Sequence, residues 1–422
     1  MKVVGLITEY NPFHNGHKYH IEQAKKITGA DHVVVVMSGN FVQRGAPAVI
    51  DKYTRTKMAL QEGADLIFEL PVTYATASAE YFALGAVSIL DSLGFVDSIC
   101  FGSECGNITL LSEIASVLCE EPHEYQTLLN ENIKKGQSFP SAREHALTSY
   151  LSRPETQLQN DQQDLVDTLA SPNNILGIEY IKALKLLNSK ITPYTITRIC
   201  SGYHEEDLTG SISSASSIRQ YINTNKGTPA SLSQLEESMP SHAYGLLLDA
   251  QEKSSPIVAD DFSMLLYYKL LYSDVGSLTS YLDINEDYAQ RILNEHIRFT
   301  SISSFGEALK AKNLTRSRID RMLFHILLNI KKDLYQTSSK THPIYLRLLG
   351  MRKESSFLIK SSTLDSTKPI ITKMADARDK LSEESYRHLQ LEIQASTLYN
   401  QVVYQKYGTT LKDEYRHGIV IV

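Results

Sequence analysis

Two histidines near the start of the chain have the residue type and spacing of a phosphate-binding pair. His14 and His17 lie three positions apart, and Gly16 directly precedes the second. At a helix N-terminus, imidazoles and free backbone N–H groups can donate hydrogen bonds to triphosphate oxygens, and the helix dipole favours negative charge. These donors would stabilise the charge that builds as pyrophosphate leaves. The pattern alone also fits a turn histidine followed by a solvated histidine at a helix start.

A hydroxyl-rich stretch, Ser213–Arg219, is the second candidate phosphate site. It supplies Ser214, Ser216 and Arg219 at the entrance to a predicted helix. Serine hydroxyls and backbone amides can bind phosphate oxygens, and an arginine can neutralise their charge. By itself the stretch is equally compatible with a flexible serine loop that caps a helix. Together with the histidine pair, it predicts a second wall around a triphosphate.

The elements that must position these residues form an α/β pattern over the first 110 residues. Strands separated by helix-length segments imply right-handed crossovers, so we predict a doubly wound, Rossmann-like parallel sheet. The expected strands are Val3–Ile7, His32–Met37, Asp65–Leu70 and Val96–Phe101, with helices at His17–Lys26, Asp51–Glu62 and Ser78–Leu93. Ligands of such sheets bind beyond the carboxyl ends of the strands. This edge collects the loops Thr8–Gly16, Ser38–Gly45 and Gly102–Gly106.

The α/β pattern fades near residue 225, which predicts two domains. Residues 1–225 would form a nucleotide-binding catalytic domain. Within it we expect a mostly helical segment at 107–170 with an exposed polar insertion at Glu155–Asp164, a helix opened by Ser171 and Pro172, and a strand at Thr195–Ile199. Residues 226–422 are predicted to be mainly helical, with a shorter mixed segment after Lys340.

A local basic patch stands out in the second domain. Eight basic residues lie between Arg298 and Lys332, opposed in that stretch only by Glu307 and Asp320. The five that we single out as candidate RNA contacts are Arg316, Arg318, Arg321, Lys331 and Lys332. Arg318, Arg321 and His325 fall near one helical face, which suits an RNA backbone, although a solvated helix face is the alternative. In the first domain, Arg44 is a candidate for either RNA or phosphate.

Composition narrows the class of protein. The chain has 422 residues, a formal net charge of −6 and 42% hydrophobic residues, so it is globular and not basic as a whole. No apolar stretch approaches the roughly 20 residues of a membrane helix, and the N-terminus has no signal-peptide pattern. The four cysteines have no accompanying zinc spacing and are expected to be reduced. A cytoplasmic protein without a membrane partner is the expectation.

At this point the residues resemble the HIGH superfamily of nucleotidyltransferases, and most closely its bacterial tRNA(Met) cytidine acetate ligase family. The segments that carry the resemblance are Gly5–His20, Ser38–Gly45, Gly63–Pro71, Phe101–Glu104, Ser171–Tyr180 and Tyr345–Gly350. The first 220 residues hold the most specific motifs. The sequence departs from the superfamily at Ala215, where a hydroxyl is often found, which leaves the individual roles in that loop open.

The resemblance implies that ATP and acetate form acetyl-adenylate, and that the acetyl group then passes to N4 of the wobble cytidine of elongator tRNA(Met). His14 and His17 would be catalytic, and Mg²⁺ would be held mainly by phosphates, with no protein metal site. The second domain would bind tRNA. The implied ATP-binding residues are Ile7, Thr8, Glu9, Tyr10, Asn11, Pro12, Phe13, His14, Asn15, Gly16, His17, Lys18, Tyr19, His20, Gly102, Asn173, Arg198, Ser214, Ser216 and Arg219.

Other functions remain open on the sequence alone. A small-molecule adenylyl- or cytidylyltransferase would share the ATP site, although its chain is often far shorter. An aminoacyl-tRNA synthetase relative would carry a Lys-Met-Ser-Lys-like loop, which is absent from this sequence. A catalytically silent RNA-binding protein would not need the intact pair of His14 and His17. Asn173, Arg198 and Gly102 are each also compatible with ordinary structural roles.

Overall fold

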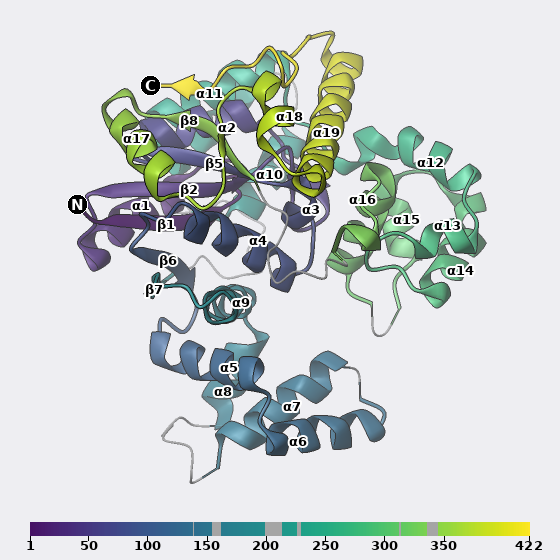
Figure 1. The fold of residues 1–422 in the computed structure, drawn as a ribbon. Coiled ribbons are helices and arrows are strands. Elements are labelled where there is room, and N and C mark those ends of the chain that lie inside the picture. The colour runs from purple at the N-terminus through teal and green to yellow at the C-terminus, as the bar shows by residue number, and fades with distance from the viewer. Residues whose placement is uncertain (138, 154–161, 199–212, 226–228, 312–313, 336–344) are drawn as a thin grey trace.

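The computed structural model describes residues 1–137, 139–153, 162–198, 213–225, 229–311, 314–335 and 345–422. Its centre is a mainly parallel sheet with strand order β10-β8-β5-β2-β1-β6-β7, and β9 pairs with β8 (Figure 1). The strands are β1 (Val3–Thr8), β2 (His32–Ser38), β5 (Leu66–Leu70), β6 (Ser98–Ser103), β7 (Thr192–Thr197), β8 (Leu346–Met351), β9 (Ile370–Ile371) and β10 (Val420–Ile421). The four strands expected in the first 110 residues are therefore confirmed, with ends shifted by one or two residues.

The order of the strands reverses beside β1. The chain runs from β1 outward to β2 and β5, and then returns to the other side of β1 as β6, with all these strands parallel. Such a reversal leaves a crevice above the carboxyl ends of the two neighbouring strands. The loop after β1 lies at that place, so the predicted phosphate loop occupies the switch point of the sheet.

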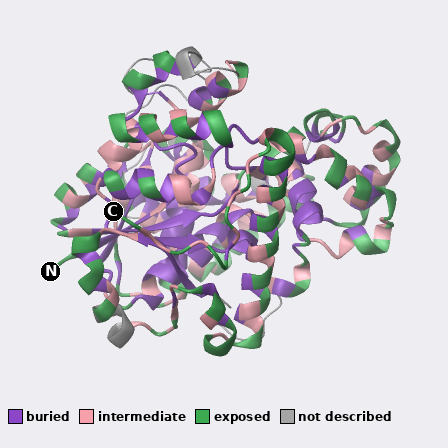
Figure 2. Cartoon of the chain, turned by 90° about the horizontal axis from the view of Figure 1, so that it is seen from above, coloured by how far each residue is buried: buried purple, intermediate pink, exposed green. Residues whose placement is uncertain are grey.

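The valine run of β2 shows how the sequence builds both faces of the sheet. Val33 and Val35 pack on one face, and Val34 and Val36 pack on the other, because side chains alternate along a strand. The first face is covered by α1 (Asn15–Thr28), α2 (Lys52–Gln61), α10 (Ala215–Thr224) and α11 (Ser241–Lys253). The second is covered by α4 (Ala79–Ser92), α5 (Ile108–Glu120) and α9 (Pro172–Leu186). Figure 2 shows buried residues concentrated in this central layer.

Two helical groups extend from the sheet (Figure 1). The first comprises α5, α6 (His123–Lys134), α7 (Phe139–Leu151) and α8 (Gln162–Ala170), which confirms the helical prediction for 107–170. Pro172 is the first residue of α9, as expected, and Ser171 occupies the N-cap position. The Ser171 side chain makes no capping hydrogen bond, and its hydroxyl donates instead to the carbonyl oxygen of Asp167 at 2.8 Å. Residues 155–161 of the predicted polar insertion lie outside the described residues, whereas its end forms the start of α8.

The second helical group has a hydrophobic core of its own. It contains α12 (Ser263–Leu271), α13 (Val275–Thr279), α14 (Glu286–Glu295), α15 (Ile302–Ala308) and α16 (Arg316–Leu328). Its core reaches the first domain through Phe41 on a short hairpin, β3 (Phe41–Val42) and β4 (Ala46–Pro47), which follows β2. The 3₁₀ helices are η1 (Pro229–Ser238), η2 (Ala259–Phe262), η3 (His296–Arg298), η4 (Lys332–Tyr335), η5 (Lys353–Ser355) and η6 (Met374–Asp376).

The C-terminal segment returns to the central sheet. Strand β8 pairs antiparallel with β5, and β10 at the C-terminus pairs with β8. The remaining helices are α3 (Val72–Ala75), α17 (Ser356–Asp365), α18 (Ala377–Lys380) and the long α19 (Glu383–Tyr407), which packs on α3. The sheet therefore draws strands from both sides of the domain boundary that we placed at residue 225. The pairing of β8 is non-local, and a short apolar run in a mixed segment does not specify its partner strand.

Candidate active site

His14 and His17 form the N-terminal cap of α1. The Nδ1 atom of His14 accepts a hydrogen bond from the backbone N–H of Gly16 at 3.1 Å. The Nδ1 atom of His17 accepts one from the backbone N–H of His14 at 3.2 Å, which completes a capping box. The two ring centroids lie 3.8 Å apart. Because both Nδ1 atoms accept, a neutral ring carries its proton on Nε2, and each histidine has one N–H left to donate.

Burial keeps these histidines neutral. Burial, with smaller contributions from the positive charges of Arg198 and Arg219, lowers the pKa of His14 to about 3. Burial also lowers the pKa of His17 well below 6.5, with His14 and Arg198 as further causes. His20, one turn along α1, has its pKa lowered to about 4 by burial, and its Nε2 lies 3.2 Å from the carbonyl oxygen of Cys100. The pair is therefore a set of neutral hydrogen-bond donors at neutral pH.

The backbone before the histidines is held in an unusual conformation. Tyr10 has φ of +47°, which few residues other than glycine adopt, and its side chain is fully buried. Its ring packs 4.8 Å from those of Phe13 and His17. The Oδ1 atom of Asn11 accepts from the backbone N–H of Val49 at 2.9 Å. These contacts fix the turn that aims the histidines above the sheet.

Arg55 holds the same turn from below, and the sequence analysis missed it. Its guanidinium is completely buried and donates to the carbonyl oxygens of Glu9 at 2.6 Å, Ser38 at 3.1 Å, Ile50 and Gly39. The loops after β1 and β2 are thereby joined through one side chain. The local sequence carries no signal of this burial, because Arg55 is flanked by Thr54 and Thr56 in a helix that also carries Lys52. A buried arginine requires acceptors around it, and here distant loops supply them.

Arg219 brings the two predicted phosphate segments together. Its Nη1 donates to the carbonyl oxygen of Asn11 at 2.9 Å, and its Nη2 donates to Oγ of Ser216 at 3.0 Å. Arg44 of the β3–β4 hairpin also reaches Ser216, at 3.4 Å. Burial lowers the pKa of Arg219 to about 10, so it remains charged at neutral pH. Three loops that lie far apart in the sequence thus meet beside the histidine turn.

Ser214 has a structural use in this arrangement. Its hydroxyl is the N-cap of α10 and accepts from the backbone N–H of Ser217 at 3.0 Å. Ser214 therefore caps the helix, whereas the hydroxyl of Ser216 lies between Arg44 and Arg219. The earlier part of the serine-rich loop, residues 201–212, lies outside the described residues.

Gly102 and Arg198 lie on the far side of β1, at the ends of β6 and β7. A Cβ atom on Gly102 would lie 3.0 Å from Cγ of Arg198, so the glycine leaves room for this arginine. Arg198 is anchored by its backbone N–H, which donates to the carbonyl oxygen of Ser103 at 3.0 Å. Its charge is felt by His14, His17 and His20. Arg198 and Arg219 therefore both lie near the histidine pair.

Asn173 is engaged by Glu104, a residue that the sequence analysis did not select. The Nδ2 atom of Asn173 donates to Oε1 of Glu104 at 2.6 Å. The neighbouring Asn174 is buried, and its Oδ1 accepts from the backbone N–H groups of Glu104 at 2.9 Å and Cys105 at 3.2 Å. The start of α9 is thus joined to the loop that follows β6.

A buried cluster of charges lies under the loop that follows β2. Lys52 Nζ lies 2.5 Å from Glu69, 3.3 Å from Glu392 and 3.0 Å from Glu414. Arg347 binds Glu69 at 3.3 Å and also Glu414. Burial and the charge of Glu69 raise the pKa of Glu392 to about 8, whereas Lys52 and Arg347 outweigh burial and lower the pKa of Glu414. This cluster joins α19 and the C-terminal tail to the first domain.

The basic patch of the second domain is largely engaged in internal contacts. Arg316 pairs with Glu307 and Asp320, and Nε of Arg321 lies 3.7 Å from Asp283. Lys332 donates to the carbonyl oxygen of Ile284 at 2.7 Å. Arg318 and Lys331 lie over the rings of Tyr288 at 5.2 Å and Tyr281 at 5.9 Å, respectively. Lys312 lies outside the described residues, and RNA contact by the five selected residues stays a prediction.

One expectation about this patch was wrong. His325 is fully buried and contacts the carbonyl oxygens of Leu282 at 3.1 Å and Thr76 at 2.9 Å, so it does not share an exposed face with Arg318. The face of α16 that carries His325 is buried against the first domain. Helical periodicity alone does not show which polar residue of a helix lies on its buried face. Across the described part of the chain, no group of three or more His, Cys, Asp or Glu side chains is placed to hold a metal ion.

A doubly wound sheet with histidine-capped α1 at its switch point defines an α/β protein of the nucleotide-binding class. The HIGH Nucleotidyl Transferase family matches residues 1–414. The tRNA(Met) cytidine acetate ligase of Acetivibrio thermocellus is 42% identical over 401 residues, 94% of each chain. That of Caldanaerobacter subterraneus subsp. tengcongensis is 39% identical over 421 residues, the full length of both. The chain belongs to the HIGH nucleotidyltransferases and, among them, to the tRNA(Met) cytidine acetate ligase family.

Solved structures agree with this placement. The crystal structure of Thermotoga maritima TmcAL bound with alpha-thio ATP is 31% identical and superposes with a TM-score of 0.90 over the whole of both chains. The apo structure of the same protein gives a TM-score of 0.93. The α/β fold with a mainly helical C-terminal part is therefore confirmed. None of the described helices is long and apolar enough to cross a membrane.

Proposed function

We propose that this chain uses ATP to activate acetate and transfers the acetyl group to N4 of the wobble cytidine of elongator tRNA(Met). In the first step an acetate oxygen attacks the α-phosphorus of ATP, the bond to pyrophosphate breaks, and acetyl-adenylate forms. In the second step N4 attacks the acetyl carbon, AMP leaves, and N4 loses a proton. The products are AMP, pyrophosphate and N4-acetylcytidine in tRNA, and the reaction takes place in the cytoplasm.

The observation that carries the proposal is the neutral His14–His17 cap beside Arg219. The capping hydrogen bonds occupy both Nδ1 atoms, and no residue that the structure describes accepts from either Nε2–H, so each can donate to a phosphate oxygen. Arg219, Arg198 and the N-terminus of α1 supply positive potential at the same place. Such donors stabilise the charge that develops on departing pyrophosphate without a change in their own protonation.

Other residues serve to position the nucleotide. Gly102, at the end of β6, would lie beside the adenosine, and Ser216 offers a hydroxyl between Arg44 and Arg219. The chain supplies no nucleophile of its own, since acetate and cytidine supply both attacking atoms. Mg²⁺ would bind phosphate oxygens and water in the manner common for nucleotide complexes.

The experiment follows each half-reaction separately. Purified protein is given ATP, labelled acetate and bulk tRNA, and label is followed in RNA; acetate-dependent exchange of pyrophosphate into ATP reports the first step alone. We expect both signals, and we expect both to disappear in His17→Ala. Label in RNA that is undiminished in His17→Ala would refute the catalytic assignment. Adenylylation of a small phosphate ester without acetyl transfer would favour a small-molecule nucleotidyltransferase.

A further inference from the structure

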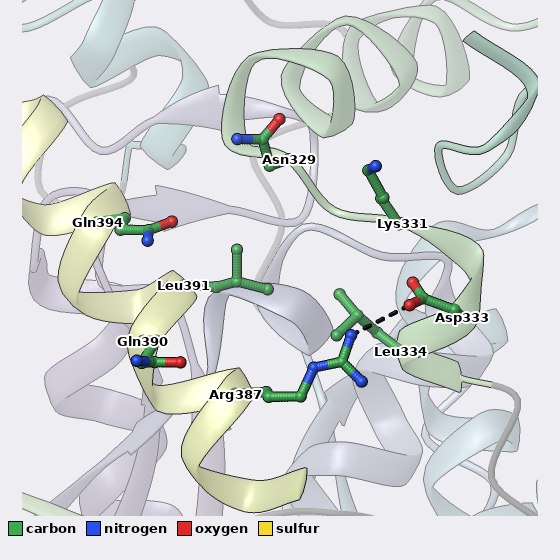
Figure 3. Close-up of a pocket in the computed structure, with 8 residues that line it drawn as sticks. All are labelled: Asn329, Lys331, Asp333, Leu334, Arg387, Gln390, Leu391 and Gln394. Carbon is green, nitrogen blue, oxygen red and sulfur yellow. Dashed lines mark hydrogen bonds and ion pairs between the residues drawn. The ribbon is translucent and has the colours of Figure 1, made fainter. Parts of the chain in front are cut away.

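A pocket of about 300 Å³ lies outside the ATP site, between the end of α16 and helix α19 (Figure 3). Its α19 wall consists of Arg387, Gln390, Leu391 and Gln394. These positions are spaced by three and four residues, so they share one face of the helix. Among the residues that the structure describes, none hydrogen-bonds the side-chain amide of Gln390 or Gln394. Both glutamines are exposed, so two amides that can donate and accept line the pocket where a ligand can reach them.

The opposite wall supplies positive charge and a further amide. Lys331 is exposed, and no carboxylate of the described residues lies within ion-pair distance of its Nζ, which lies 5.9 Å from the Tyr281 ring. Asn329 uses its Oδ1 to accept from Lys269 at 2.5 Å, which leaves its NH₂ group for the pocket. Arg387 keeps an ion pair with Asp333 at 3.1 Å, as Figure 3 shows. The pocket therefore carries net positive charge in a chain whose net charge is −6.

The pocket also has an apolar surface beneath these groups. Leu334 is buried and Leu391 is half-buried, and both line it. A small apolar surface bounded by amides and a cation suits a nucleotide. Its base has a face for apolar contact and an edge for hydrogen bonds, and its phosphate requires a cation.

We propose that this pocket binds one unpaired nucleotide of the RNA substrate. The base lies against Leu334 and Leu391, Gln390 and Gln394 hydrogen-bond its edge, and Lys331 faces its phosphate. The proposal rests on the proposed function, because it requires RNA as the acceptor. It replaces a general basic patch by a defined site, since Arg316, Arg321 and Lys332 are already engaged within the protein.

Helices α16 and α19, which form the pocket, also contact the β3–β4 hairpin that carries Arg44. Phe41 of β3 packs 5.9 Å from Phe324 of α16 and 6.1 Å from Tyr399 of α19. A Cβ on Gly45 would lie 2.3 Å from the backbone nitrogen of Arg321, so hairpin and α16 are in direct contact. Asn329 follows Arg321 by eight positions, about 12 Å along a helix at about 1.5 Å per residue. A nucleotide bound in the pocket would therefore fix the position of the RNA relative to the loop that carries His14 and His17.

The test compares the double variant Gln390→Ala/Gln394→Ala and the variant Lys331→Glu with two controls. Gln401→Ala removes an exposed glutamine of the same helix outside the pocket, and Lys190→Glu reverses an exposed charge before β7, at the opposite edge of the sheet. We expect kcat/KM for tRNA to fall about tenfold in each pocket variant, the effect of losing one base-reading contact, with little change in the controls. Acetate-dependent pyrophosphate exchange should keep its wild-type rate throughout.

A second measurement identifies the nucleotide. Transcripts with single abasic positions through the anticodon loop, except at the wobble cytidine that accepts the acetyl group, are acetylated by the wild-type protein and by Gln390→Ala/Gln394→Ala. One abasic position should lower the wild-type rate about tenfold and should have no further effect in the double variant. The pocket proposal would be overturned if both pocket variants kept the wild-type kcat/KM for tRNA. It would also be overturned if every abasic position lowered the rate of the double variant as much as that of the wild type. Absence of pyrophosphate exchange in the wild-type protein would instead contradict the proposed function.

Discussion

The rings of His14 and His17 lie 3.8 Å apart, each accepts a backbone hydrogen bond through Nδ1, and none of the described residues hydrogen-bonds either Nε2. One half of each imidazole thus builds the start of α1, and the other half can contact phosphate. This division allows the structural and chemical roles of each ring to be separated by substitution.

His17→Asn should separate them. The asparagine oxygen can replace Nδ1 as acceptor for the backbone N–H of His14, but nothing replaces Nε2–H. We expect acetate-dependent pyrophosphate exchange to fall by about 10²–10³, as for loss of one donor to a developing charge. The melting temperature should change little, whereas His17→Ala should lose both activity and the cap. Near-wild-type exchange in His17→Asn would show that Nε2 takes no part in catalysis.

The buried histidines should make stability depend on pH. The folded pKa of His14, about 3, lies below its ordinary value of 6.5, so the unfolded chain binds more protons as the pH falls below 6.5. Stability due to this group is present above that pH and is lost toward pH 3. Between pH 6.5 and 5 the loss should be about 2 kcal/mol. The free energy of unfolding, measured with denaturant, should depend less on pH in His14→Asn than in the wild type. Equal pH dependence in the two proteins would contradict this prediction.

Arg219→Lys should weaken ATP binding. A lysine keeps the charge but cannot donate to Asn11 and Ser216 in the same fork. We expect the KM for ATP in pyrophosphate exchange to rise by about tenfold, because the triphosphate loses a guanidinium that is held in a fixed position. Ser214→Ala is the comparison: it removes a helix cap and should cost about 1 kcal/mol of stability. If the KM for ATP rose in Ser214→Ala and not in Arg219→Lys, the assignment of ATP binding to Arg219 and of helix capping to Ser214 would be wrong.

Glu392→Gln should stabilise the protein at high pH. The folded pKa of Glu392, about 8, is above its ordinary value of 4.5, so the wild type loses stability as the pH rises from 4.5 to 8. Glutamine resembles the protonated form and removes this loss. The melting temperature of the variant relative to wild type should therefore increase between pH 5 and pH 8. Glu414→Gln, which removes a carboxylate that stays ionised, should be destabilising at both pH values.

The sequence by itself determined the first half of the sheet, the loop that bears the histidines, and the serine-rich segment with Arg219. These depend on local signals: a β-branched run such as Val33–Val36, capping residues, and a histidine spacing that is meaningful directly after a first strand. The resemblance to the HIGH nucleotidyltransferases was also carried by short, contiguous motifs.

Only the tertiary structure decided how distant segments meet. Arg219 binds Asn11 across 208 residues, and Lys52 binds Glu392 across 340. The antiparallel pairing of β8 with β5, the burial of His325 and the pocket between α16 and α19 depend likewise on contacts between separate elements. Local propensity and periodicity specify which face of a helix or strand is apolar, but not which element will cover it. That choice is made by packing and by the need of each buried charge for a partner.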